Sequence, residues 1–214
     1  MMKPPVAGLY VVTAASRARS LEQSVAEAIA GGARVVQYRD KSSDAARRKL
    51  EAKALAALCR EHGVAFIIND DIELAARVEA DGVHVGQHDA AVAEARAALG
   101  EAAIVGASCY DDLDRAERAL AAGADYLAFG SVYPSVTKPE SKIAPLSIFA
   151  EARALTDKPL VAIGGINAGN IASVTAAGAD CVAVIDAVFA ADDIRAAAAE
   201  LVRNGFAGQS DQEQ

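Results

Sequence analysis

The feature of the sequence that most restricts its fold is a regular alternation of two kinds of segment. Short runs rich in Val, Ile, Leu and Tyr occur eight times, and Ala-rich segments with helical spacing lie between them. The eight runs cover residues 9–13, 35–39, 65–69, 82–85, 103–108, 126–130, 160–165 and 181–185. A strand followed by a helix, repeated eight times, predicts a single (β/α)₈ barrel, the TIM-barrel architecture of the α/β class.

A weak internal repeat supports the same count. Gly-Ala-Arg at 32–34, Ala-Asp-Gly at 80–82 and Gly-Ala-Asp at both 123–125 and 178–180 each come directly before an even-numbered run. A repeat every second strand is what a βαβα unit produces. An open, doubly wound sheet is the alternative, but the first run is not followed by the Gly-x-Gly-x-x-Gly turn typical of many such folds.

Length and charge limit the domain organisation and the partners. The 214 residues contain no internal linker, so we predict one barrel domain over residues 1–205 and a disordered polar tail over residues 206–214. The formal charge of −8 argues against binding to nucleic acid or to an anionic membrane. The beginning of the chain does not read as a signal peptide, and no apolar run approaches about 18 residues, so a cytoplasmic protein is expected. The oligomeric state stays open.

The three cysteines give no sign of a disulfide framework or a metal site. Cys59, Cys109 and Cys181 are odd in number, far apart and outside any Cys-x-x-Cys pair. We expect three reduced, buried thiols.

Polar residues and glycines collect where a barrel would place its active site. In a (β/α)₈ barrel that site is built by the loops that follow the carboxyl ends of the strands. Seven of the eight runs are followed by such residues. They are Gln37, Arg39, Lys41, Asn69, Asp70, Gln87, Asp89, Ser108, Ser135, Thr137, Lys138, Gly164, Gly165 and Asp186.

Taken together, these residues are suited to binding phosphorylated ligands. Two carboxylates beside an asparagine can hold Mg²⁺, which prefers oxygen ligands and accepts a diphosphate. Arg39, Lys41 and Lys138 would neutralise the rest of the diphosphate charge. A second phosphate is expected on the loops after the sixth to eighth runs, where barrels commonly bind one.

Taken singly, the same residues have purely structural interpretations. Three aspartates precede helical segments and are candidates for helix N-caps, namely Asp70, Asp71 and Asp89. Arg39 and Lys41 could belong to a solvated charge cluster, and Gly164 with Gly165 could form only a tight turn. His84 and His88 are four residues apart, but His84 falls in a strand, so a zinc site is not expected. No histidine is predicted to act as a catalytic base.

An ordered set of motifs resembles the thiamine phosphate synthase family over nearly the whole chain. The motifs are QYRDK (37–41), IINDD (67–71), GVHVGQHD (82–89), GAS (106–108), FGSVYPSVTKP (129–139), AIGGI (162–166) and VAVIDAVFA (182–190). The Q-x-R-x-K and P-S/T-x-T-K-P elements are the most specific of these. The resemblance implies a Mg²⁺-dependent transferase that couples hydroxymethylpyrimidine diphosphate with thiazole phosphate and releases pyrophosphate through a dissociative carbocation mechanism.

The resemblance also implies a role for each matching residue. Asp70 and Asp89 would bind Mg²⁺. The diphosphate would be held by Arg39, Lys41, Asn69 and Lys138. Gln37 and Ser108 would face the pyrimidine. The thiazole phosphate would be held by Ser135, Thr137, Gly165, Ile185 and Asp186. Among these residues the resemblance assigns direct roles in catalysis to Arg39, Lys41, Ser108 and Lys138.

The sequence departs from the family pattern at two positions. Tyr38 stands where the family usually has Leu, and strand alternation predicts that its side chain points away from Gln37 and Arg39. Asp186 stands where the family often has Ser, next to the expected phosphate. Its carboxylate would repel that ligand unless it caps the following helix and turns away.

Two other functions are open to a barrel with these motifs. One is a related thiazole tautomerase activity, which requires no coupling. The other is a catalytically silent phosphate-binding barrel, because a fold does not by itself imply a reaction.

Overall fold

The computed structural model describes residues 6–14, 19–86, 91–134 and 142–207. Eight parallel strands form a closed barrel in sequence order, and β8 pairs with β1 to complete it. The strands are β1 Gly8–Val12, β2 Ala33–Tyr38, β3 Ala65–Asn69, β4 Gly82–Val85, β5 Ile104–Tyr110, β6 Tyr126–Phe129, β7 Leu160–Ile163 and β8 Cys181–Val184. This closure confirms the predicted (β/α)₈ barrel and excludes the open, doubly wound sheet.

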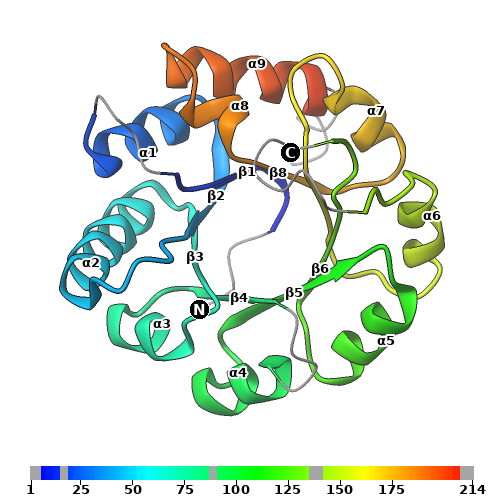
Figure 1. The fold of residues 1–214 in the computed structure, drawn as a ribbon, viewed down its shortest axis with the longest axis horizontal. Coiled ribbons are helices and arrows are strands. Elements are labelled where there is room, and N and C mark those ends of the chain that lie inside the picture. Colours follow the sequence, from blue (N-terminus) through cyan, green and yellow to red (C-terminus); the bar gives the residue numbers. More distant parts are fainter. Residues whose placement is uncertain (1–5, 15–18, 87–90, 135–141, 208–214) are drawn as a thin grey trace.

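The helices surround the barrel as an outer ring (Figure 1). They are α1 Leu21–Ala30, α2 Ala45–His62, α3 Ile72–Val78, α4 Ala91–Leu99, α5 Leu113–Ala121, α6 Ile148–Arg153, α7 Ile171–Ala176, α8 Asp186–Phe189 and α9 Ile194–Phe206. Helix α9 includes Phe206, whose side chain is buried, so helical structure extends one residue into the predicted tail. Residues 208–214 lie outside the described ranges. Among the described helices, none combines the length and apolarity that crossing a membrane requires.

Local sequence signals explain where several helices begin and end. Ser20 and Gln23 form a capping box at the start of α1, in which the Gln23 N–H donates to Ser20 Oγ over 3.2 Å. Helix α2 ends at Gly63, which adopts a φ of 65° that favours glycine. Strand β7 ends at Ile163, two residues earlier than predicted, because Gly164 and Gly165 have φ values of 104° and 64° and turn the chain out of the sheet.

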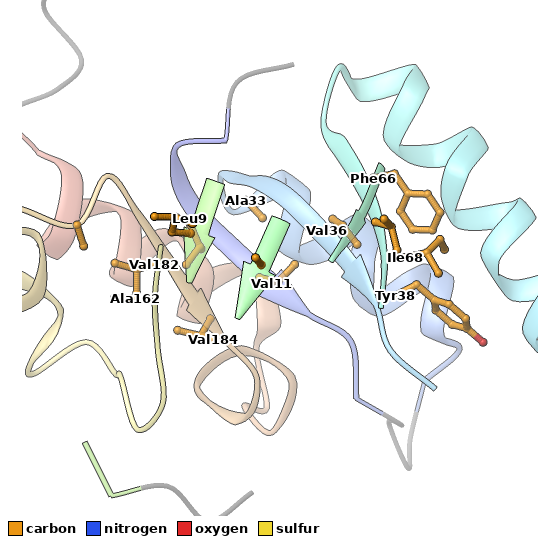
Figure 2. Packing of buried hydrophobic residues seen from close by; sticks show 14 of the residues in the cluster. Leu9, Val11, Ala33, Val36, Tyr38, Phe66, Ile68, Ala162, Val182 and Val184 are labelled. Carbon is orange, nitrogen blue, oxygen red and sulfur yellow. The ribbon is translucent and has the colours of Figure 1, made fainter. Parts of the chain in front are cut away.

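Alternation along the strands separates two apolar cores. Side chains such as Tyr10, Ile67 and Tyr126 fill the inside of the barrel. The opposite faces of the strands pack under the helices, and Figure 2 shows Val36 and Phe66 in this outer layer. All three cysteine thiols are buried, as predicted.

The repeated aspartates tie down the amino-terminal end of the barrel. Asp81, Asp125 and Asp180 each use Oδ2 to accept the backbone N–H of a residue in the preceding odd-numbered strand, at 2.8 Å, 2.9 Å and 2.8 Å respectively. Arg96 and Arg153 pair with the second and third of these carboxylates. The repeat is therefore structural, and it lies at the end of the barrel opposite to the predicted site.

Candidate active site

A cavity of about 150 Å³ opens at the carboxyl ends of the strands. Its walls are largely apolar, from residues such as Val161 and Ile163 of β7. Its polar lining consists of Tyr10, Gln37, Arg39, Asn69, His84, Ser108, Tyr110, Tyr126 and Ser131. A small apolar chamber with a few polar groups is the usual form of a site for an organic ring. We call this space the inner cavity.

A second, more polar hollow of about 650 Å³ lies beside it, between β1, β2, α1 and α2. Arg39 and Ile185 border both spaces, so the two are neighbours at the barrel mouth. We call this space the outer hollow. Its charged lining consists of Arg19, Glu22, Arg39, Asp40, Lys41, Arg47, Glu51 and Asp186.

The structure brings part of the predicted site together. Six of the predicted residues line the inner cavity: Gln37, Arg39, Asn69, Ser108, Gly164 and Ile185. Lys41 and Asp186 line the outer hollow instead. Five further predicted residues lie outside the described residues: Gln87, Asp89, Ser135, Thr137 and Lys138.

Asp70 and Asp71 are adjacent but lie in different environments. Asp71 is the N-cap of α3, where its Oδ1 accepts from the Leu74 N–H over 2.8 Å and its Oδ2 pairs with Arg48 over 2.6 Å. The N-cap interpretation is therefore correct for Asp71 and wrong for Asp70. Asp70 has a φ of 61°, a strained conformation for a residue with a side chain.

The carboxylate of Asp70 is held at the carboxyl end of the barrel. Its Oδ2 accepts from Asn69 Nδ2 over 2.7 Å, and its backbone N–H donates to the His84 carbonyl over 2.8 Å. Its Oδ1 approaches Gly86 closely enough that a Cβ there would lie 3.3 Å away. Asp70 and Asn69 thus provide oxygen donors of the kind that Mg²⁺ prefers. Asp70 lies beside Gly86, the last described residue before position 87. The described residues contain no cluster of three His, Cys, Asp or Glu side chains that could hold a metal ion.

A network of charges holds the turn after β2. Asp40 lies between Arg39 and Lys41 in sequence, and its carboxylate accepts from Arg47 over 2.5 Å and from the Ser42 N–H over 2.7 Å. Burial alone would raise the pKa of Asp40, but the hydrogen bonds from Ser42 and the charge of Arg47 outweigh it and lower the pKa. This network is formed by Asp40, Ser42 and Arg47 rather than by the Arg39 and Lys41 pair of the sequence interpretation, and it orders the segment that carries Arg39 and Lys41.

Tyr38 points away from the inner cavity, as predicted. Its ring is buried in the outer core, and its hydroxyl donates to Glu51 of α2 over 2.7 Å. The opposite face of the same strand presents Gln37 to the inner cavity. The departure from Leu at this position thus adds a strand-to-helix hydrogen bond behind the site.

The turn formed by Gly164 and Gly165 supports the neighbouring loop as well as reversing the chain. A Cβ on Gly164 would lie 1.9 Å from Ser131 Oγ, and one on Gly165 would lie 2.4 Å from the Pro134 carbonyl oxygen. The Tyr133 N–H also donates to the Gly164 carbonyl over 3.1 Å. Both glycines are needed because the loop after β6 packs directly against them.

The expectation that Asp186 caps a helix is wrong. The N-cap of the short helix α8 is Ile185, and Asp186 is the first residue of the helix itself. Asp186 lines the outer hollow together with Lys41 and Arg47.

The prediction assigned no site role to histidine, and the structure differs on this point. His84 Nε2 lies 2.8 Å from Ser108 Oγ, and His84 Nδ1 lies 2.9 Å from Tyr126 Oη. Tyr10 joins the same group through Tyr126 Oη at 3.0 Å. These three residues were missed because they read as ordinary members of apolar strands. The signal that identifies them is strand parity, since each lies in the same inward register as Gln37 or Ser108.

Comparisons with known proteins agree on one family. A family model described as "Thiamine monophosphate synthase" matches residues 9–188. The chain is 55% identical over 204 residues to a thiamine-phosphate synthase of Halorhodospira halophila, covering 94% of this chain and 97% of that protein. It is 56% identical over 202 residues to one of Chromobacterium violaceum, with the same two coverages, 94% and 97%.

A solved structure matches over the same extent. The thiamine phosphate pyrophosphorylase from Pyrococcus furiosus superposes with a TM-score of 0.84 at 36% identity and covers 92% of this chain and 95% of its own. A 3-hexulose-6-phosphate synthase structure has a TM-score of 0.63 at 19% identity, which shows a shared fold alone.

Proposed function

The chain belongs to the thiamine monophosphate synthase family, and from this premise we propose how the mouth of its barrel carries out the reaction. The enzyme is a transferase that forms thiamine phosphate and releases pyrophosphate. We assign the pyrimidine ring of hydroxymethylpyrimidine diphosphate to the inner cavity. Its diphosphate is assigned to the rim of that cavity, which carries Arg39 and adjoins Lys41 in the outer hollow. Thiazole phosphate is assigned to the rim beside Gly165, Ile185 and Asp186, with Ser135 and Thr137 as further ligands.

One observation carries this assignment. Gln37 and Ser108, two groups able to hydrogen-bond a heterocycle, share an apolar cavity with Arg39 and Asn69. The cation Lys41 lies in the adjoining hollow, which Arg39 also borders. A ring bound in the cavity would therefore have its charged substituent at the rim, where cations can neutralise it.

Mg²⁺ fits the oxygen donors at this rim. Asp70, Asp89 and the amide oxygen of Asn69 would hold the ion. A bound Mg²⁺ supplies positive charge that stabilises the departing diphosphate. Arg39 and Lys41 border this rim and would share that role, because a positive charge there stabilises the negative charge that develops on the leaving group. We assign the same role to Lys138.

The order of bond changes follows from the substrates. The bond between the pyrimidine methylene carbon and the diphosphate oxygen breaks first, and the electron-rich aminopyrimidine stabilises the resulting cation. The thiazole nitrogen then attacks the methylene carbon. That nitrogen carries no proton to lose, so this chain needs no strong general base. The apolar wall from Val161 and Ile163 limits access of water to the cation.

The assay that tests this function uses purified protein, both phosphorylated heterocycles and Mg²⁺. We expect thiamine phosphate and pyrophosphate in equal amounts, and loss of both products after chelation and their return when Mg²⁺ is restored. Conversion of the thiazole alone, with no diphosphate consumed, would instead support a tautomerase-like activity. Binding of both ligands without any product would support a silent barrel.

A further inference from the structure

Five polar side chains form a continuous row across the inside of the barrel. Gln37 Nε2 lies 2.7 Å from Tyr10 Oη, which lies 3.0 Å from Tyr126 Oη. Tyr126 Oη lies 2.9 Å from His84 Nδ1, and His84 Nε2 lies 2.8 Å from Ser108 Oγ. The row therefore connects β2, β1, β6, β4 and β5.

The directions of the hydrogen bonds in this row follow from its first donor once each buried hydroxyl hydrogen is given an acceptor. Gln37 donates through Nε2 to Tyr10 Oη. Either oxygen of the Tyr10–Tyr126 pair can donate, and because Tyr10 is buried we assign its hydroxyl hydrogen to Tyr126. Tyr126 in turn donates to His84 Nδ1, which places the histidine proton on Nε2. His84 Nε2–H then donates to Ser108, whose own hydroxyl hydrogen remains available.

The two ends of the row both face the inner cavity. The amide nitrogen of Gln37 is engaged by Tyr10, so its carbonyl oxygen is the atom left to accept from a ligand. At the other end, Ser108 has a hydrogen to donate. Because each hydroxyl has one hydrogen, the Ser108 end can reverse only if the links through His84 and Tyr126 reverse as well.

We propose that Tyr10, Tyr126 and His84 are positioning residues that fix one acceptor at Gln37 and one donor at Ser108. An acceptor and a donor in one cavity suit a heterocycle that carries both an amino group and a ring nitrogen, as an aminopyrimidine does. The inference deepens the proposed function and rests on it for the identity of the ligand. The hydrogen-bond direction itself depends only on the protein.

The surroundings keep the middle of the row rigid and protonated. Tyr10 and Tyr126 meet edge to face with ring centroids 6.3 Å apart, and His84 stacks on Tyr126 at 5.5 Å. A Cβ on Gly106 would lie 1.9 Å from Tyr126 Cζ, so this glycine makes room for the ring. Burial raises the pKa of both tyrosines well above the usual value, and both therefore stay neutral donors.

The test is the tautomer of His84, measured by ¹⁵N NMR of the imidazole without substrates. Spectra at about pH 8 and about pH 9 ensure that a glutamate at the buried position 37 is compared in its ionised form. We expect the Nε2–H form in the unmodified protein. In Gln37→Glu the new carboxylate can only accept, so each link must reverse and His84 should change to the Nδ1–H form. The change would report a coupling across the three hydrogen bonds that join position 37 to His84.

The matched control is Gln37→Glu combined with Tyr10→Phe, which keeps the ring but removes the hydroxyl that transmits the effect. In this background the histidine signal should match that of Tyr10→Phe alone. An Nδ1–H form in the unmodified protein, an unchanged tautomer in Gln37→Glu, or a change that persists without the Tyr10 hydroxyl would each overturn the proposal.

Kinetics separate this inference from the proposed function. In Tyr126→Phe we expect the KM for the pyrimidine diphosphate to rise about tenfold while the KM for thiazole phosphate is unchanged. An equal rise in both would contradict a role confined to the pyrimidine. If the unmodified protein forms no thiamine phosphate, the proposed function fails, whereas the tautomer measurement still decides whether the directional row exists.

Discussion

At the scale of single residues, two neighbouring aspartates show how position decides chemistry. Asp71 satisfies the first N–H groups of α3 and an ion pair with Arg48. Asp70 makes neither contact and has a φ of 61° at the carboxyl end of the barrel. A residue held in a strained backbone conformation at a site is commonly there for function, which agrees with Asp70 as a Mg²⁺ ligand.

The first prediction compares these two positions. Asp70→Asn, chosen because Asn tolerates a positive φ, should lower kcat by about 100-fold or more with little change in melting temperature, since metal charge at the leaving group is lost. Asp71→Ala should keep its activity and lose about 1 kcal/mol of stability through the missing cap. Activity assays and melting curves on both variants decide the matter. Near-normal turnover by Asp70→Asn would show that Asp70 is not a ligand.

The second prediction concerns Asp186, whose carboxylate lines the outer hollow. Asp186→Ser should leave kcat nearly unchanged and lower the KM for thiazole phosphate about fivefold. The reason is relief of a like-charge repulsion of about 1 kcal/mol at about 4 Å in water. Because Asp186 is not an N-cap, the loss of stability should stay within the helix-dipole range of about 0.3–1 kcal/mol.

Salt provides the control for Asp186→Ser. Added salt screens charges, so the difference in KM between the two proteins should shrink as ionic strength rises. If the serine variant instead loses coupling, the carboxylate takes part in the reaction and repulsion is the wrong account.

At the scale of elements, β2 and the start of α2 work as one unit. The inward face of β2 presents Gln37 to the cavity, while the outward face ties Tyr38 to Glu51. Glu51 lies 3.7 Å from Arg47. Arg47 also pairs with Asp40, which lies between Arg39 and Lys41 in sequence. Because successive side chains of β2 point to opposite faces, Gln37 faces the ligand cavity while Tyr38 anchors the strand to α2.

The third prediction tests that separation with two neighbouring substitutions. Tyr38→Phe removes only a hydroxyl, and it should lower the free energy of unfolding by about 1 kcal/mol with kcat nearly unchanged. Gln37→Met should raise the KM for the pyrimidine diphosphate, and the loss of its hydrogen bond to buried Tyr10 should also cost about 1 kcal/mol of stability. Urea unfolding and steady-state kinetics on both proteins provide the comparison. A large loss of kcat in Tyr38→Phe would mean that the outward face also shapes the cavity.

At the scale of the whole molecule, the chain buries thiols and tyrosines in both cores. Burial raises the pKa of Cys59 and of Cys109 to about 12, and it raises that of Cys181 as well. Tyr10 and Tyr126, inside the barrel, have raised pKa values for the same reason. The folded protein therefore retains protons at alkaline pH that an unfolded chain releases.

The fourth prediction is a loss of stability as the pH rises. Unfolded thiols ionise near a pKa of about 8.5, so between about pH 8.5 and 12 the unfolded chain binds fewer protons than the folded chain and is favoured. Denaturant unfolding measured from about pH 7 to pH 10 should show a falling free energy of unfolding above about pH 8.5. A variant with alanine at all three cysteines should show a shallower fall. Constant stability across this range in the unmodified protein would contradict the burial of the thiols.

Much of the fold was predictable because its signals are local. The eight apolar runs and the glycine turns depend on neighbouring residues, and alternation within a strand was enough to place Tyr38 on the outer face. The same parity places Gln37 and Arg39 together at the inner cavity. Motif order along the chain was sufficient to indicate the family.

The sequence by itself thus determined the barrel, the family and the residues that follow each strand, because short-range periodicity encodes them. Only the tertiary structure decided that Asp71 caps a helix while Asp70 does not, and that Lys41 and Asp186 face a different hollow from Gln37. It also decided that Tyr10 and His84 meet through Tyr126. Such contacts join strands far apart in sequence, and their geometry exists only once the barrel has closed in a particular register.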